Sequence, residues 1–138
     1  MPAGGSVAAI AVAMAAGLVA KTARLSPEWP RAAEVLERVE ALRALVAPLA
    51  QADADAYTKV LEAQRRKEGV ADALSAAADV PLAIAEAATE VASLASLAAR
   101  EGNTRLRGDA VMAAELAQAA ARGAAELVAI NLAAKTRR

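Results

Sequence analysis

The chain has 138 residues, with 16 basic and 16 acidic residues and no cysteine or histidine. A net charge of zero argues against the basic surface of a nucleic-acid binder, so we expect no nucleic-acid partner. Without cysteine and histidine, disulfides, thiol nucleophiles and typical zinc sites are excluded, we expect no metal, and any general base must be Asp, Glu, Lys or Tyr.

The composition predicts an all-α protein. Alanine is about a third of the residues, and there is one Trp, one Tyr and no Phe. Alanine is the best helix former, and the length fits one domain, residues 1–138. Alanine side chains bury little apolar surface, about 0.8 kcal/mol per carbon. We therefore expect a homodimer, most simply a two-fold one, that covers further apolar faces.

The first helix is expected over residues 7–25, after a turn formed by Gly4, Gly5 and Ser6, with Ser6 as its N-cap. Backbone N–H groups at such a helix start suit an anionic or carbonyl-bearing ligand. Apolar residues at helical spacing form one stripe, with Val12 and Val19 on another side, which predicts a central, buried helix. The members of the stripe are Val7, Ile10, Met14, Leu18 and Leu25.

The same N-terminal stretch is uncharged from Met1 to Ala20. It has no positively charged leader region, alanine and glycine dilute its hydrophobicity, and it lies at the short limit for a membrane span. We therefore expect a cytoplasmic protein without a membrane partner.

Five further helices are predicted along the chain. Ser26 caps the second, Pro27 occupies its first position, and Pro48 ends or kinks it. A break is expected at Pro81, and the helix that follows ends at Gly102. The short connections predict an up-and-down bundle of about six helices. The expected ranges after the first helix are 27–48, 49–67, 70–78, 79–100 and 109–134.

A second polar turn, GNTRLRGD over residues 102–109, opens the last helix in the same way as the first glycine turn. Asp109 is an N-cap by default, and a carboxylate held ionised at a helix start is equally a candidate general base for water. Asn103 is a candidate for orienting that water or the substrate. Because these are the only glycine-flanked polar turns before long apolar helices, we predict that Gly5 and Asp109 converge on one pocket.

Three other polar residues have two interpretations each. Lys21, within the apolar stripe, either extends to solvent from the last helical turn, which we favour, or supplies a proton-donating amine in the pocket. Asp55 either pairs with Lys59 four residues later or lines the pocket, whereas Asp53 has no such partner in its helix. Asn131, in an apolar segment, needs a buried partner or must face a cavity.

Five segments resemble, in order and spacing, motifs of the formiminotransferase-cyclodeaminase C-terminal domain family, which includes methenyltetrahydrofolate cyclohydrolases. The first, AGGSVAAIAVAMAAGLVAKTARLS, resembles the family's P-G-G-G-S-V-A-A start. DADAYTKVLEAQR resembles its D-x-A-[FY]-x-x-V segment, and AADVPLAIAEAATEV its A-x-x-V-P-L segment. EGNTRLRGDAVMAAEL is similar to G-N-(x)n-D-x-x-x-A, and GAAELVAINLAA to the closing N-V-x-I-N-L.

The sequence departs from the family pattern at identifiable positions. Ala3 replaces the first of three glycines, and Leu127 replaces the first Asn of the closing motif, so that only Asn131 remains. The family's leading helix, and the helix that usually follows the closing motif, are missing from this sequence. A trimmed member of this kind can keep the fold and still have lost the activity.

The resemblance implies folate one-carbon chemistry with no cofactor. The expected reaction is hydrolysis of 5,10-methenyltetrahydrofolate, or cyclisation of 5-formiminotetrahydrofolate with release of ammonia. The proton-transfer candidates are Asp109 and Lys21. Arg105 and Arg107 either lie in a solvated loop or clamp the glutamate carboxylates of the folate tail. The full set of expected substrate-binding residues is Gly4, Gly5, Ser6, Asp55, Asn103, Arg105, Arg107 and Asn131.

The alternative is a non-catalytic dimeric helical module that has kept the scaffold and lost the pocket. The Leu127 departure, the missing flanking helices and the scarcity of aromatic residues for pterin stacking favour this alternative.

Overall fold

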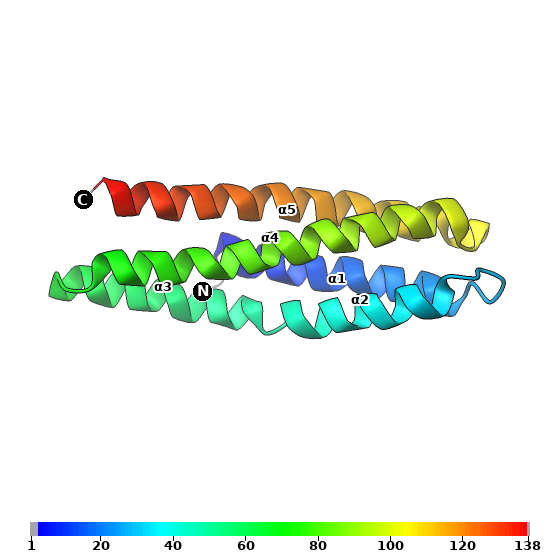
Figure 1. Ribbon diagram of the computed structural model, residues 1–138, viewed down its shortest axis with the longest axis horizontal. Coiled ribbons are helices and arrows are strands. Elements are labelled where there is room, and N and C mark those ends of the chain that lie inside the picture. Colours follow the sequence, from blue (N-terminus) through cyan, green and yellow to red (C-terminus); the bar gives the residue numbers. More distant parts are fainter. Residues whose placement is uncertain (1–2, 138) are drawn as a thin grey trace.

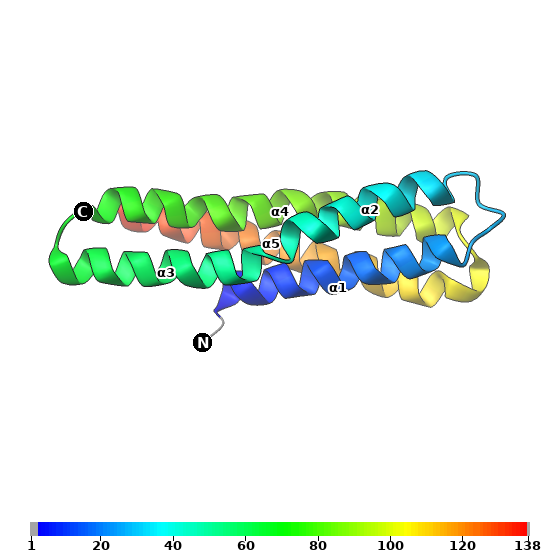
Figure 2. The same cartoon turned by 90° about the horizontal axis from the view of Figure 1, so that it is seen from below.

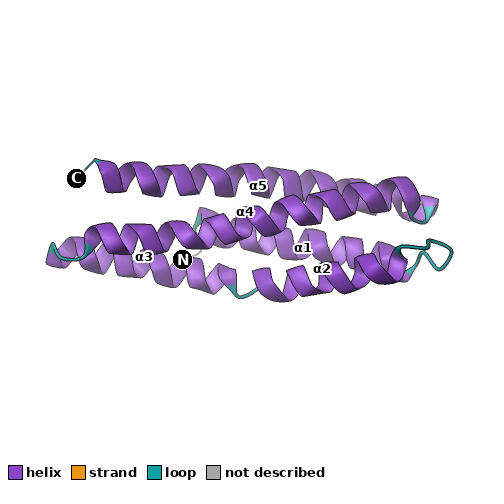
Figure 3. Ribbon diagram, viewed as in Figure 1, coloured by secondary structure: helices purple, strands orange, loops and turns teal. Residues whose placement is uncertain are grey.

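The computed structural model describes residues 3–137, which form an elongated helical bundle (Figures 1 and 3). It contains the helices α1 (Gly4–Arg24), α2 (Ala32–Val46), α3 (Leu49–Arg66), α4 (Val70–Glu101) and α5 (Arg107–Thr136), with a short 3₁₀ turn, η1 (Thr104–Leu106), before α5. The predicted all-α fold is confirmed, although the described residues form five α-helices instead of about six. Met1, Pro2 and Arg138, the ends of the predicted domain, lie outside them.

The predicted break between the fourth and fifth helices is wrong, because α4 continues through Pro81. Proline lacks the N–H that would bond the carbonyl of Ala77, and a proline inside a helix costs about 3 kcal/mol. Here Pro81 is fully buried, and α4 packs against α1, α2, α3 and α5 along its length. The packing on both sides of the proline outweighs its local cost.

The arrangement of the helices exposes the start of α1 in the middle of the molecule. α2 and α3, separated only by Ala47 and Pro48, follow one another along the side of α4 (Figure 1). α1 runs beside α2 and begins near the junction of α2 and α3, whereas α3 continues past it in the opposite direction (Figure 2). One half of the bundle therefore contains α1, α2, α4 and α5, and the other contains α3, α4 and α5. The glycine turn lies at the boundary.

The buried face of α1 is not the predicted stripe. Val12 and Val19 are buried together with six alanines, whereas the stripe residues Val7, Ile10 and Met14 are exposed, Met14 to 61%. Alanine faces allow helices to approach closely, so small residues fill the centre and the larger ones are left outside. On α5, Met112 is exposed as well, one turn after Asp109, whose ion-pair partner Lys21 lies two turns after Met14 on α1. We call Val7, Ile10, Met14 and Met112 the α1–α5 apolar face.

By length and composition alone, α1 and α4 are apolar enough to cross a membrane. More than half of the relevant window of α1 and about two fifths of that of α4 are buried inside the bundle. A core helix of a bundle passes the same test, so the apolar character of these two helices is accounted for by their packing.

At one end of the bundle, the connection between α1 and α2 is hydrogen-bonded to the turn between α4 and α5. Ser26 Oγ donates to the Thr22 carbonyl at 2.6 Å and accepts from the Asn103 N–H at 2.8 Å. Asn103 Nδ2 donates to the Leu25 carbonyl at 2.9 Å. The prediction of Ser26 as the N-cap of the second helix is wrong, because its hydroxyl is engaged here and α2 begins only at Ala32.

Gly102 lies at the end of α4, where the chain meets the end of α1. A substitution at this position gives a stability prediction. A Cβ at this position would lie 2.6 Å from the Ala98 carbonyl oxygen, which belongs to the last turn of α4. We expect Gly102→Ala to lower the free energy of unfolding by about 1–3 kcal/mol. Gly108→Ala, which meets no atom within 4 Å, should be neutral or stabilising by up to about 1 kcal/mol. Equal midpoints for the two variants in urea unfolding would contradict this explanation.

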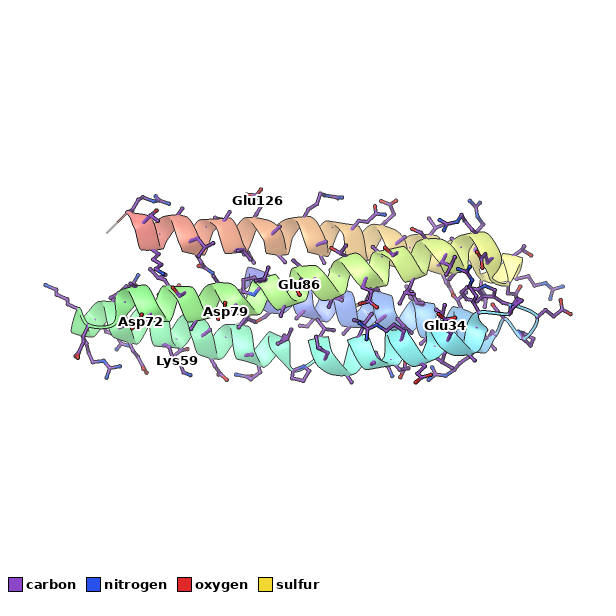
Figure 4. All side chains as sticks on the ribbon, viewed as in Figure 1. Glu34, Lys59, Asp72, Asp79, Glu86 and Glu126 are labelled. Carbon is purple, nitrogen blue, oxygen red and sulfur yellow. The ribbon has the colours of Figure 1, made fainter. Side chains whose placement is uncertain are left out.

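The outer faces of the helices carry the charges, and side chains such as Glu34, Asp72 and Glu126 project away from the bundle (Figure 4). One ion pair links α2 to α4: the Arg38 guanidinium donates two hydrogen bonds to Glu90, one of 2.6 Å. These bonds lower the pKa of Glu90. The pair therefore stabilises the fold at neutral pH, and its contribution is lost as the pH falls through that lowered pKa.

Candidate functional site

A cavity of about 310 Å³ lies at the start of α1, between α3, α4 and α5. Its volume is at the lower end of the range for small-molecule sites. Val60, Leu74 and Leu127 contribute apolar walls. The side chains that bring polar atoms to it are Asp53, Tyr57, Gln64 and Asn131. A mostly apolar cavity with a few converging polar groups is the usual form of a ligand site.

The Asp53 carboxylate rests directly against the glycine turn. A Cβ on Gly5 would overlap all three carboxyl atoms of Asp53, so only glycine lets the carboxylate lie this close to the helix. The carboxylate accepts a hydrogen bond from the Ser6 backbone N–H, at the positive end of the α1 dipole. The N–H groups that we expected to bind a ligand are thus engaged, in part, by a carboxylate of the same chain.

Ser6 fixes this arrangement but is not the predicted N-cap. α1 begins at Gly4, with Ala3 at the N-cap position and no side-chain cap. Ser6 is buried in the first turn, and its hydroxyl donates to the Ala50 carbonyl at 2.6 Å. This bond joins the start of α1 to the first turn of α3, the helix that carries Asp53.

Burial raises the pKa of Asp53 above the usual value for an aspartate, while the hydrogen bond from the Ser6 N–H opposes this increase. The effect of burial is the larger of the two. A raised pKa brings a carboxyl group closer to neutral pH, where it can both accept and donate a proton. Such perturbed groups in cavities are candidates for acid–base catalysis.

Asn131 faces the cavity, one of the two environments that the sequence allowed for it. It is half-buried, and within residues 3–137 its side chain makes no hydrogen bond; the same holds for Tyr57 and Gln64. Leu127 also reaches the cavity and contacts Gly4, so the departure from the family pattern makes this part of the wall apolar. The three polar side chains are free to bind a ligand.

Asp55 lies outside this cavity. It lines a separate cavity of about 370 Å³ between α3 and α4, together with Lys59. The predicted ion pair with Lys59 is wrong, because the Asp55 carboxylate instead accepts a hydrogen bond from Gln51 Nε2 at 2.9 Å. Asp53 and Asp55 thus lie on different faces of α3 and line different cavities.

Asp109 and Lys21 form an exposed ion pair of 2.7 Å at the other end of α1. Sixteen residues separate Lys21 from Gly5, which is about 24 Å along a helix. Within one subunit, the predicted convergence of Gly5 and Asp109 is therefore wrong, because α1 and α5 run antiparallel. Asp109 is also not an N-cap: it is the third residue of α5 and makes no capping hydrogen bond.

Asn103, Arg105 and Arg107 lie at this same distant end. The Asn103 side chain is occupied by the Leu25 carbonyl and by the Arg105 N–H, for which it acts as the cap of η1. Arg105 lines an open cavity with Trp29, and Arg107 is exposed. Of the residues expected to bind substrate, only Gly4, Gly5, Ser6 and Asn131 gather around the Asp53 cavity.

Sequence reasoning missed Asp53 as a site residue, along with Tyr57 and Gln64. The available signal was that Asp53 lacks an oppositely charged residue at helical spacing, unlike Asp55. An unpaired carboxylate on a helix is most easily explained by a partner elsewhere in the fold, and here that partner is the start of α1.

The sequence model of the formiminotransferase-cyclodeaminase family matches residues 1–136. The chain belongs to the formiminotransferase-cyclodeaminase family. The resemblance identified in the sequence is thereby confirmed. Methenyltetrahydrofolate cyclohydrolase from Methylorubrum extorquens is 33% identical over an alignment of 148 positions, covering 94% of this chain and 71% of that protein. The crystal structure of formiminotetrahydrofolate cyclodeaminase from Thermotoga maritima is similar with a TM-score of 0.88 and 30% identity, covering 95% of this chain and 70% of that one.

Proposed function

We propose that this family member is an enzyme of folate one-carbon metabolism. It either hydrolyses 5,10-methenyltetrahydrofolate or forms that compound from 5-formiminotetrahydrofolate with release of ammonia. The observation that carries the proposal is the Asp53 carboxyl group, whose pKa is raised and which is held at a helix start inside the cavity. The two relatives are named for these two reactions.

In the hydrolytic reaction, Asp53 takes a proton from water as the water oxygen bonds to the methenyl carbon. The addition converts the cationic amidinium into a neutral tetrahedral intermediate. Asp53 then returns its proton to N5 as the bond between carbon and N5 breaks, and the hydroxyl proton is lost to solvent as the formyl group forms. Proton transfer by a positioned carboxyl group is worth about 10²–10⁴-fold in rate.

In the cyclisation, N10 attacks the carbon of the protonated formimino group and loses its own proton to Asp53, which gives a neutral tetrahedral intermediate. The protonated Asp53 then supplies a proton to the departing nitrogen. The bond between carbon and that nitrogen breaks, and ammonia leaves as the methenyl bridge closes. Both reactions need one group that accepts and then donates a proton near neutral pH, which is what the raised pKa of Asp53 supports. Asn131 and Tyr57 would orient the substrate through their free side-chain groups.

We also propose that the protein is a homodimer through the α1–α5 apolar face. Contiguous exposed apolar side chains mark interaction surfaces, and a two-fold interface brings the same surface of both copies together. A two-fold axis near Met14 would bring each position before Met14 level with the partner's position equally far after it. Val7 and Lys21 are both seven residues from Met14. The axis would place the partner's Lys21, with its bound Asp109, level with Val7 and thus near the glycine turn. The convergence that fails within one subunit would then arise between two.

A cysteine at the axis tests the dimer. A residue on a two-fold axis meets its own copy, so Met14→Cys should give a disulfide-linked dimer under mild oxidation, in a chain that has no native cysteine. Leu45→Cys, at a similarly exposed apolar position of α2, should stay unlinked. The measurement is non-reducing electrophoresis together with light scattering of the wild type. A wild-type mass near 13.9 kDa at micromolar concentration would overturn the proposal.

The activity is tested by giving the purified protein each substrate separately. We expect either loss of the methenyl absorbance of 5,10-methenyltetrahydrofolate, or ammonia release from 5-formiminotetrahydrofolate. Isothermal titration with 5-formyltetrahydrofolate measures binding independently of turnover. No turnover of either substrate together with no binding would contradict the proposal and support the non-catalytic helical module.

A further inference from the structure

We propose that the main-chain carbonyl oxygen of Ala77, freed by Pro81, is a hydrogen-bond acceptor for ligand N–H groups in the Asp53 cavity. The inference deepens the proposed function and rests on it, because the ligand considered is a reduced folate. It assigns a role to Pro81, which the sequence predicted to be a helix break and which lies inside α4.

The Ala77 carbonyl lacks its normal helical partner. In an α-helix each carbonyl accepts from the N–H four residues later, and residue 81 is a proline without an N–H. α4 remains helical on both sides of this position. Among residues 3–137, the side chains that donate to main-chain carbonyls do so elsewhere, to oxygens such as those of Ala50 and Leu25.

The residue that carries the freed oxygen lies on the face of α4 that borders the cavity. Ala77 lines the cavity together with Asp53 and Asn131. Pro81 follows one turn later, about 40° around the helix, and a helical carbonyl points toward the residue four positions on. The pyrrolidine ring also pushes this carbonyl away from the helix axis. The oxygen therefore lies between two buried residues, Ala77 at 7% exposure and Pro81.

A buried acceptor without a partner is unfavourable unless a ligand or water satisfies it. The Ala77 carbonyl therefore adds an acceptor on α4 to the cavity, separate from the Asp53 carboxylate on α3, which the proposed reactions use at the carbon between N5 and N10. A complementary ligand group donates an N–H to this carbonyl. The reduced pterin ring of a tetrahydrofolate has several N–H donors, in its ring and its amino group, whereas its glutamate tail carries a single amide N–H beside carboxylates. We assign the pterin end of the substrate to this part of the cavity.

The test restores the missing N–H. Pro81→Ala gives residue 81 an N–H that binds the Ala77 carbonyl within the helix. Isothermal titration with 5-formyltetrahydrofolate should then give a Kd about three- to tenfold higher than that of the wild type, the effect of losing one neutral hydrogen bond. Val80→Ala, a neighbouring change that keeps Pro81 and lines the other cavity, should bind like the wild type.

A backbone ester distinguishes the effect of the free Ala77 carbonyl from the effect of losing the proline ring. Lactic acid, introduced at position 81 by nonsense suppression, has the side chain of alanine but no N–H, so it frees the Ala77 carbonyl again. We expect its Kd to return to the wild-type value. Wild-type affinity in Pro81→Ala, or equally weak binding by the alanine and ester variants, would overturn the carbonyl assignment. Absence of binding by the wild type itself would instead overturn the folate proposal on which the inference rests.

Discussion

Asp53→Asn is expected to lower turnover of the folate substrate by about 10²–10⁴-fold, because the amide can neither accept nor donate the transferred proton. The amide oxygen can still accept the hydrogen bond from the Ser6 N–H. The cavity should therefore keep its shape, and binding of 5-formyltetrahydrofolate should change much less than kcat. A parallel loss of binding and turnover would indicate a structural role for Asp53.

The same substitution should raise the melting temperature at neutral pH. Burial raises the pKa of Asp53 in the folded state, so the ionised form is less favourable there than in the unfolded chain. The carboxylate therefore destabilises the fold above its folded-state pKa, and this effect disappears as the pH falls below the unfolded value. The difference in melting temperature between Asp53→Asn and the wild type should shrink as the pH is lowered through this range.

Asp55→Asn is the matched control for this variant. It makes the same chemical change two residues away on α3, where the carboxylate is exposed and bonded to Gln51 outside the Asp53 cavity. Turnover should stay close to that of the wild type. If Asp55→Asn abolished turnover and Asp53→Asn did not, the acid–base role would belong to Asp55.

Gly5→Ala is the second substitution with a large expected effect. The added methyl group would occupy the position of the Asp53 carboxylate, which must rotate away from the start of α1. Turnover should fall by about 10²-fold or more, as in Asp53→Asn, because the same group is lost. Stability should change little, since alanine favours the helix by about 1 kcal/mol and offsets part of the strain. Combining the two substitutions should cause no further loss, because they remove one function.

Gly4→Ala supplies the control for Gly5→Ala. Its Cβ would lie 3.4 Å from Leu127 Cδ1, an ordinary van der Waals contact, and no atom of Asp53 lies within 4 Å of it. The gain in helix propensity is the same, so stability should rise slightly while turnover stays near the wild-type level. Equal losses in the two glycine variants would contradict the specific clash with Asp53.

The sequence was sufficient to predict the all-α fold, because alanine content and helical periodicity are local properties, and it limited Asn131 to a buried partner or a cavity. The prediction of which face of α1 is buried was wrong. The prediction assumed that the largest apolar residues point inward, whereas closely packed alanine helices leave Met14 and its neighbours outside. It also made Pro81 a break, because the tertiary packing that keeps α4 continuous is not a local property of the sequence.

The site was only partly predictable for a similar reason. The glycine turn was recognised from its own residues, but its partner, Asp53, is almost fifty positions away in the chain. The choice of Asp109 rested on the likeness of two helix starts. Whether two starts meet depends on the relative direction of their helices, and the antiparallel pairing of α1 and α5 separates them.

The bond between the Ser6 N–H and the Asp53 carboxylate has a consequence for amide hydrogen exchange. The first N–H groups of a helix have no partner within it and normally exchange quickly with solvent. The Ser6 amide is an exception, since its acceptor comes from α3 and is present only when α1 is docked. Its exchange rate therefore reports how often the start of α1 opens, and comparison with amides in the centre of the bundle separates local opening from global unfolding.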